Sequence, residues 1–103
     1  MKMKKYNHQI SQIARELTGQ HIRFLANVSP DAARKLNDAI SSTIRAIRTN
    51  PFQFPIWQSP IELPHEYRKA VVNKHHLILY FVEGNFIHID YIFDTRMDNT
   101  KWF

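Results

Sequence analysis

The 103-residue sequence contains no cysteine and no long apolar run. Without cysteine the chain can form neither a disulfide framework nor a thiolate metal site, and a reducing compartment suits it. The longest apolar run, Leu77 to Val82, is far shorter than the ~20 residues that a membrane-spanning helix needs. The first residues, MKMKKYNHQ, lack the apolar core of a signal peptide. We therefore expect a cytoplasmic protein that makes no membrane contact.

Acidic residues are the minority charge, with 9 Asp and Glu against 14 Lys and Arg, which gives a formal net charge of +5. An excess of positive charge favours an anionic partner, either a phosphate backbone or an acidic protein. A basic surface that serves solubility alone is the alternative. The length predicts one domain over residues 1–103, which buries roughly 60–70% of the surface that the unfolded chain exposes.

Apolar spacing in the first half of the chain predicts two adjacent helices. Ser11 suits the N-cap of the first helix. Ser29-Pro30-Asp31 suits the start of the second, because a capping hydroxyl, an early proline and a first-turn acid each favour a helix N-terminus. Asn50-Pro51 ends it, since the residue before proline is pushed out of the α region. We expect a helical hairpin with buried stripes at Ile13, Ala14, Leu17, His21, Phe24, Leu25 and Val28, and at Ala32, Ala33, Leu36, Ala39, Ile40, Thr43, Ile44 and Ile47.

Two irregular segments flank this hairpin. Residues 4–10 are expected to form a short edge strand, whose lysines suit an exposed sheet edge. The segment PFQFPIWQSPIELP carries four prolines among large apolar residues. It is expected to pack as irregular structure over the helical hairpin, with Trp57 as a lid.

From residue 67 the sequence changes to the alternation of strands. Three β-rich blocks, Arg68 to Val72, Leu77 to Val82 and Phe86 to Phe93, are separated by Asn73-Lys74 and Glu83-Gly84-Asn85, which suit hairpin connections. This pattern predicts a three-stranded antiparallel meander. The predicted fold class is α+β, in the order β-α-α-β-β-β, with the helical hairpin packed on one face of a small, mainly antiparallel sheet.

Two-residue turns at Asn73-Lys74 and Gly84-Asn85 would divide the strand residues into two faces. The more apolar face, expected to pack on the helices, holds Lys69, Val71, His76, Ile78, Tyr80, Val82, Ile87, Ile89, Tyr91 and Phe93. The other face holds Arg68, Ala70, Val72, Leu77, Leu79, Phe81, His88, Asp90 and Ile92. Under any register Arg68 and Lys69 point in opposite directions, so one of them faces outward.

The element order, the segment NPFQFP, the strand block YRKAVVNKHHLILYFV and the closing IDYIFDTRMDN resemble the RelE/ParE superfamily of type II toxin–antitoxin toxins. The resemblance covers nearly the whole chain. It implies a growth-inhibiting toxin that a cognate antitoxin, acidic and partly disordered, neutralises. It implies one of two targets, translated mRNA on the ribosome or DNA gyrase.

In the RelE branch, the resemblance implies a metal-independent mRNA endonuclease with a basic cluster on the sheet. Arg68 matches a strand lysine or arginine of that branch, Arg96 matches the arginine after the last strand, and Trp102 lies near the position of its terminal tyrosine. Arg68, Arg96 and His76 are the predicted catalytic residues. The residues predicted to bind the target are Lys69, Lys74, His75, His88, Lys101 and Trp102.

Two positions depart from the nuclease pattern. Leu77 stands where the RelE branch has a middle-strand arginine, and Ala70 stands where it has a second strand lysine. Cleavage by the RNA 2′-hydroxyl requires general acid–base groups and positive charge at the phosphate, and leucine supplies neither. His75, His76 or His88 would have to compensate. Both departures resemble the ParE branch, whose members poison gyrase without cutting RNA.

No metal or cofactor is predicted from the sequence. His75 and His76 are adjacent, point to opposite faces of a strand and have no nearby cysteine or spaced third ligand. A non-toxic binding module or a decayed toxin that keeps the fold is the alternative to a toxin.

Overall fold

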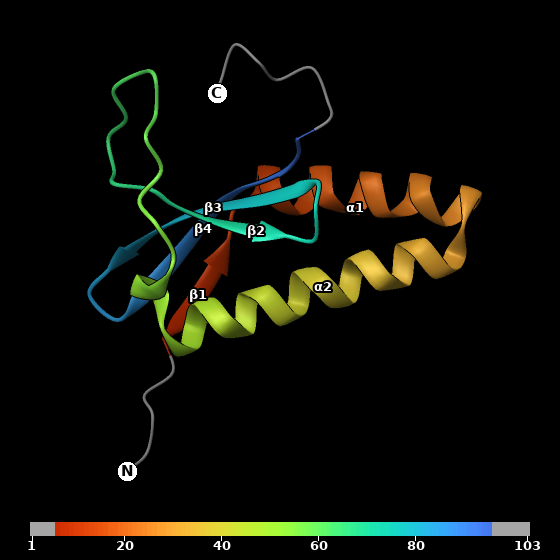
Figure 1. The fold of residues 1–103 in the computed structure, drawn as a ribbon, viewed down its shortest axis with the longest axis horizontal. Helices are drawn as coiled ribbons and strands as arrows, with labels where there is room; N and C mark the ends of the chain where they lie inside the picture. The colour runs from red at the N-terminus through yellow and green to blue at the C-terminus, as the bar shows by residue number, and fades with distance from the viewer. Residues whose placement is uncertain (1–5, 96–103) are drawn as a thin grey trace.

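Residues 6–95 are described by the computed structural model of the chain (Figure 1). The described elements follow the predicted order, so the α+β prediction is confirmed. They are β1 (Asn7–Ile10), α1 (Gln12–Val28), α2 (Pro30–Thr49), the short 3₁₀ helix η1 (Pro51–Gln53), β2 (Arg68–Val72), β3 (His76–Glu83) and β4 (Phe86–Asp94).

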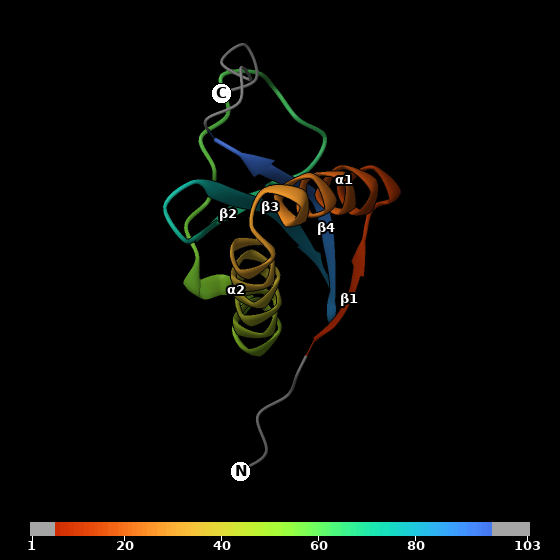
Figure 2. The ribbon, with the colours of Figure 1, turned by 90° about the vertical axis from the view of Figure 1, so that its right-hand side faces the viewer.

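The strands form one four-stranded sheet in the order β1-β4-β3-β2. β2, β3 and β4 are the predicted antiparallel meander, and β1 pairs in parallel with β4. β1 therefore lies at a sheet edge, as predicted. Both helices pack on one face of the sheet, and their hairpin extends past the sheet in Figure 1 and points toward the viewer in Figure 2.

Serine side chains set the helix ends where the sequence predicts them. Ser11 Oγ accepts a hydrogen bond from the Ala14 amide at 3.0 Å. Ser29 joins the two helices, because its amide donates to the Leu25 carbonyl at the end of α1 while its Oγ accepts from the Ala32 amide of α2. The hairpin thus turns through a single residue, and the prediction of two adjacent helices is confirmed.

The main core lies between α2 and the sheet. The five buried residues of α2 all belong to its predicted stripe: Ala33, Leu36, Ile40, Ile44 and Ile47. Four of them, all except Ala33, pack against the helix-covered sheet face, where Ala70, Val72, Ile78, Tyr80, Ile87 and Ile89 are buried. Tyr80 also donates its hydroxyl hydrogen bond to the Pro51 carbonyl, which fixes η1 beneath the sheet edge.

The predicted buried stripe of α1 is wrong in part. Ile13, Leu17, Phe24 and Val28 keep exposed fractions of 60%, 52%, 66% and 71%. Two members of the predicted stripe do face inward, since Ala14 is buried and Leu25 packs on the core, and they are joined there by Ile22, which the prediction leaves out. The helix carries apolar residues on two adjacent stripes, and only one can face the sheet and α2. The other stripe remains an exposed apolar surface along α1.

The segment between η1 and β2 also differs from its prediction. Phe54 packs into the main core, but Trp57 packs on the opposite sheet face, against Tyr67, Leu77 and Leu79. The backbone explains the crossing, because Trp57 N–H donates to the Tyr67 carbonyl and Lys69 N–H donates to the Pro55 carbonyl. The segment thereby covers the free edge of β2 and then folds over the outer face, which is the sheet face away from the helices. Trp57 is a lid on the outer face, not on the helical hairpin.

The predicted sheet faces need two corrections. Val72 pairs with His76, so the β2–β3 connection has three residues, Asn73, Lys74 and His75, instead of two. Asn73 adopts a left-handed φ of 46° at this turn, a conformation that asparagine tolerates. The extra residue reverses the faces of β2: Arg68, Ala70 and Val72 lie on the helix-covered face, and Lys69 and Val71 lie on the outer face.

The second correction is a β-bulge in β4. The Gly84-Asn85 turn has two residues as predicted, since Glu83 pairs with Phe86. Further along, Leu79 pairs with Tyr91 but Tyr80 pairs with Ile89, which leaves Asp90 as an extra residue. The bulge reverses the faces of the last part of β4: Ile92 and Asp94 lie on the helix-covered face, while Tyr91 and Phe93 lie on the outer face.

Within residues 6–95, neither helix combines the length and the apolar character that crossing a bilayer would demand.

Candidate functional site

Arg68, a predicted catalytic residue, is engaged in contacts with the η1 segment. Its Nη1 donates to the Phe54 carbonyl at 2.7 Å, and its guanidinium carbon lies 5.2 Å from the centre of the Phe52 ring. Glu66 and Glu83 line the same small cavity of about 170 Å³. A cavity lined by two carboxylates does not suit a phosphate ligand. Arg68 therefore holds η1 against the edge of the sheet.

Three residues of the predicted target-binding set lie elsewhere. Lys69 is half-buried on the outer face, opposite to the side chain of Arg68. Lys74 and His75 are exposed at the β2–β3 turn. The His75 backbone belongs to this turn, since its amide donates to Asn73 Oδ1 and its carbonyl accepts from the Thr95 amide. None of these three side chains therefore shares a site with the Arg68 guanidinium.

His88 belongs to a stack of rings on the outer face. Its ring lies 4.5 Å from that of Phe81, centre to centre and nearly parallel, and His65 stacks on the same Phe81 ring at 3.8 Å. His88 Nε2 is 3.4 Å from a carboxylate oxygen of Glu83. His88 is therefore half-buried between aromatic neighbours. The negative charge of Glu83 beside it would oppose the binding of an anionic target.

Asp90 receives hydrogen bonds from both sides of the bulge. The Tyr67 hydroxyl donates to its carboxylate, and Ser11 Oγ donates to its backbone carbonyl. Burial raises the pKa of the Tyr67 hydroxyl far above its ordinary value, and the hydrogen bond to Asp90 raises it further. Tyr67 thus stays a neutral hydrogen-bond donor at physiological pH.

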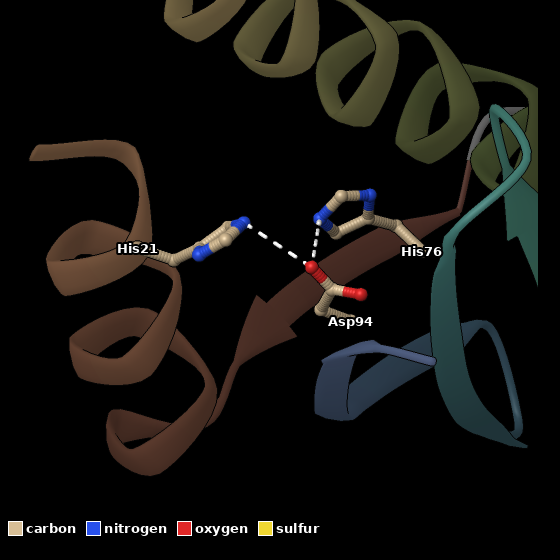
Figure 3. A group of neighbouring side chains, drawn as sticks. All are labelled: His21, His76 and Asp94. Carbon is tan, nitrogen blue, oxygen red and sulfur yellow. Dashed lines mark ion pairs between the residues drawn. The ribbon is translucent and has the colours of Figure 1, made fainter. Parts of the chain in front are cut away.

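His76, the third predicted catalytic residue, is buried on the helix-covered face at the start of β3. Its neighbours include two residues that the sequence analysis does not connect with it, His21 of α1 and Asp94 at the end of β4 (Figure 3). Both imidazoles point toward the same carboxylate oxygen, with His21 Nε2 at 3.6 Å and His76 Nε2 at 3.9 Å from Asp94 Oδ2. We call these three residues the His–His–Asp cluster.

The His–His–Asp cluster borders a cavity of about 610 Å³ that opens between α1, α2, the start of β3 and the end of β4. The apolar part of its lining includes two residues of the exposed α1 stripe, Leu17 and Phe24, and two core residues of α2, Leu36 and Ile40. A concave apolar site with a few polar groups is the usual form of a ligand-binding site.

Three residues of the predicted site, Arg96, Lys101 and Trp102, lie outside the described residues. Among those that are described, Arg68 and His76 share the helix-covered face but belong to different cavities, while Lys69 and His88 lie on the outer face. The described part of the predicted site is therefore divided between two faces of the sheet.

The sequence reasoning missed His21 and Asp94. The apolar spacing predicts His21 only as one position of a buried helical stripe, and Asp94 directly follows the last predicted strand. The only available signal was composition: with no cysteine, the histidines are the soft ligands of this chain. Their partners become visible only after folding, because α1, β3 and β4 each contribute one residue to the cluster.

Neither a protein-family model nor a curated protein matches this chain. The resemblance to the RelE/ParE superfamily therefore depends on the residues and the element order described above.

Proposed function

We propose that the chain is a growth-inhibiting toxin of a type II toxin–antitoxin module, which acts by binding DNA gyrase. Support for the toxin class comes from the β-α-α-β-β-β order together with the strand block that resembles the RelE/ParE superfamily. Support for binding over RNA cleavage comes from one observation: Arg68 and His76 on one face, and Lys69 and His88 on the other, form no common cluster.

An acidic, partly disordered antitoxin is the proposed partner. The exposed apolar stripe on α1 and the adjoining cavity offer apolar surface that a folding peptide can bury. The net charge of +5 favours an acidic chain over a neutral one. Binding there would leave the antitoxin in contact with α1, α2 and the end of the sheet.

RNA cleavage by the described residues lacks support on chemical grounds. The Arg68 guanidinium already bonds the Phe54 carbonyl, and two carboxylates line its cavity. Leu77 is buried under Trp57 on the outer face, so it supplies no charge at the middle strand. An endonuclease would need its acid, its base and its phosphate-binding cation at one place.

Induction of the chain alone in a bacterial host tests the toxin class. We expect growth to stop, to resume when the acidic protein of a neighbouring gene is co-expressed, and to continue in cells that express Arg96→Ala. Arg45→Ala, an exposed change on α2, is the matched control and should remain toxic. Unaltered growth despite soluble accumulation of the wild-type chain would favour the non-toxic module.

The target is tested in the same arrested cells. A gyrase-directed toxin should cause DNA breaks while messages remain intact, and the purified chain should inhibit supercoiling by gyrase. Codon-linked cuts found by primer extension on translated mRNA, with unbroken DNA, would instead assign the chain to the ribosome-dependent nucleases.

A further inference from the structure

The His–His–Asp cluster has the donor set of a metal site. Two imidazole nitrogens and one carboxylate oxygen converge from three elements, and all three donor atoms lie within 4.8 Å of one another. Nitrogen and oxygen donors of this kind suit Zn²⁺ and neighbouring divalent transition metals. Figure 3 shows both rings directed at the same oxygen of Asp94, with that oxygen between them.

The side chain of Asn73 determines which nitrogen of His76 faces the cluster as a ligand. Asn73 Oδ1 accepts a hydrogen bond from the His75 backbone amide, so the oxygen of this side-chain amide, and not its nitrogen, faces into the turn. The same oxygen lies 3.2 Å from His76 Nδ1, which must therefore carry the proton and donate. In neutral His76 the lone pair is then on Nε2, the nitrogen directed at Asp94. A hydrogen bond to the ring nitrogen that does not bind the metal is how proteins orient metal-binding histidines.

The distances fit a shared cation better than direct hydrogen bonds. His21 Nε2 and His76 Nε2 stand 3.6 Å and 3.9 Å from Asp94 Oδ2, which is too long for good hydrogen bonds. Donors around a tetrahedral zinc ion with bonds of about 2.0–2.1 Å are separated by about 3.4 Å. Within residues 6–95, His21 Nε2 is buried without a hydrogen-bond partner. The His21 side chain is 29% exposed, so it can move the remaining distance.

We propose that His21, His76 and Asp94 bind one Zn²⁺ ion, with the fourth coordination position directed into the 610 Å³ cavity. Three protein ligands and one open position are the arrangement of zinc sites that bind a further group. In this chain the open position would accept water or an anionic oxygen, such as a carboxylate of a bound acidic partner. The ion would also connect α1 to the ends of β3 and β4. This proposal goes beyond the toxin function and does not depend on it.

The test is to titrate Zn²⁺ into the purified, metal-stripped full chain and to measure the heat of binding by calorimetry. The melting temperature is then measured with and without the ion. We expect one equivalent to bind and the melting temperature to rise, because an ion that binds only the folded state stabilises it. Co²⁺ should bind in place of Zn²⁺ and give the visible absorption of a tetrahedral site without sulfur. Failure of the wild-type chain to bind Zn²⁺ saturably would overturn the proposal.

Variants distinguish the cluster from the other histidines. His21→Gln and Asp94→Asn should each weaken Zn²⁺ binding by more than about 100-fold, since even the loss of a group that only hydrogen-bonds to a ligand costs about 10–100-fold. His65→Gln and His75→Gln, both exposed and outside the cluster, are the matched controls and should bind as the wild type does. Equal affinity in His21→Gln and wild type would contradict the site, and so would a comparable loss in the two controls.

Asn73→Gly isolates the orienting bond. Glycine accepts the positive φ of this turn but removes Oδ1. We expect a 10–100-fold loss of Zn²⁺ affinity with the three ligands still present. Far-ultraviolet circular dichroism of each metal-free variant checks that the fold is kept. His76 is not substituted in any variant, because it is buried and its loss could disturb the fold. An unchanged affinity in folded Asn73→Gly would overturn the assignment of Nε2 as the ligand atom.

Discussion

The two faces of the sheet are buried in different ways. On the helix-covered face, aliphatic residues of β3 and β4 meet the regular stripe of α2. On the outer face, Tyr67, Leu77 and Leu79 are buried beneath Trp57 and Leu63 of the irregular segment before β2. A helix held by its own hydrogen bonds can collapse little into a cavity, whereas an irregular segment can move. Equal burial on the two faces should therefore not mean equal contributions to stability.

Ile78 and Leu79 allow the largest test of this comparison, because these neighbours point to opposite faces and are almost completely buried. Truncation of a buried aliphatic residue costs about 2–5 kcal/mol, and the cost depends on how far the surroundings relax. We expect Ile78→Ala to lower the free energy of unfolding by an amount near the top of that range and Leu79→Ala by an amount near the bottom. Urea unfolding measures both.

Val71→Ala serves as the control for these two variants. Val71 lies on the outer face with an exposed fraction of 62%, so its change should stay within about 0.5 kcal/mol. A loss for Leu79→Ala equal to that for Ile78→Ala would show that the outer cover is as rigid as the helices.

Arg68 and Lys69 provide a test of intermediate size at the edge of β2. Arg68→Ala removes the hydrogen bond to the Phe54 carbonyl and the contact with the Phe52 ring. It should cost about 1–2 kcal/mol, since a charge-assisted hydrogen bond at a partly exposed site is worth about that much. Lys69→Ala should cost less than about 0.5 kcal/mol. Identical urea midpoints would contradict the proposed structural role of Arg68.

The smallest expected effect is the pH dependence of stability that comes from His8, on the helix-covered face of β1. Burial lowers the pKa of His8, and the nearby positive charge of Arg48 lowers it further. The unfolded chain therefore takes up this proton at a higher pH than the folded chain does. The contribution of His8 to stability should be present above the unfolded-state pKa of about 6.5 and be lost as the pH falls from there through the lowered folded-state pKa.

His8→Gln removes this titration. We expect the variant to lose less stability than the wild type between pH 7 and pH 5, as measured by urea unfolding across that range. Parallel curves for the two proteins would mean that the pKa of His8 is the same in the folded and unfolded states.

Local chemistry allowed much of the fold to be predicted. Ser11, Ser29 and Pro30 determine where the helices begin by capping and by a fixed φ, and these effects act within a few residues. The meander was equally clear, because alternation and turn residues mark each strand. The apolar stripe of α1 shows the limit of periodicity: two adjacent stripes were both apolar, and only packing against α2 and the sheet decides which one is buried.

The candidate site was less predictable, because it depends on register. A third residue in the Asn73–His75 turn reversed the faces of β2, and the bulge at Asp90 reversed the end of β4. Alternation alone assumes that neither event occurs. His21, His76 and Asp94 become neighbours only because α1 packs beside the sheet. No local pattern in the sequence predicts this long-range contact.

The bulge at Asp90 shifts the phase of β4 by one residue, with consequences beyond its own contacts. With strict alternation, Asp94 would stand among the rings of the outer face, and Tyr91 would point into the core. Deletion of a single residue here would therefore exchange the two sets of side chains over the rest of the strand, a larger change than any one substitution. When related sequences are aligned with this chain, the number of residues between Ile89 and Asp94 matters as much as the aspartate itself.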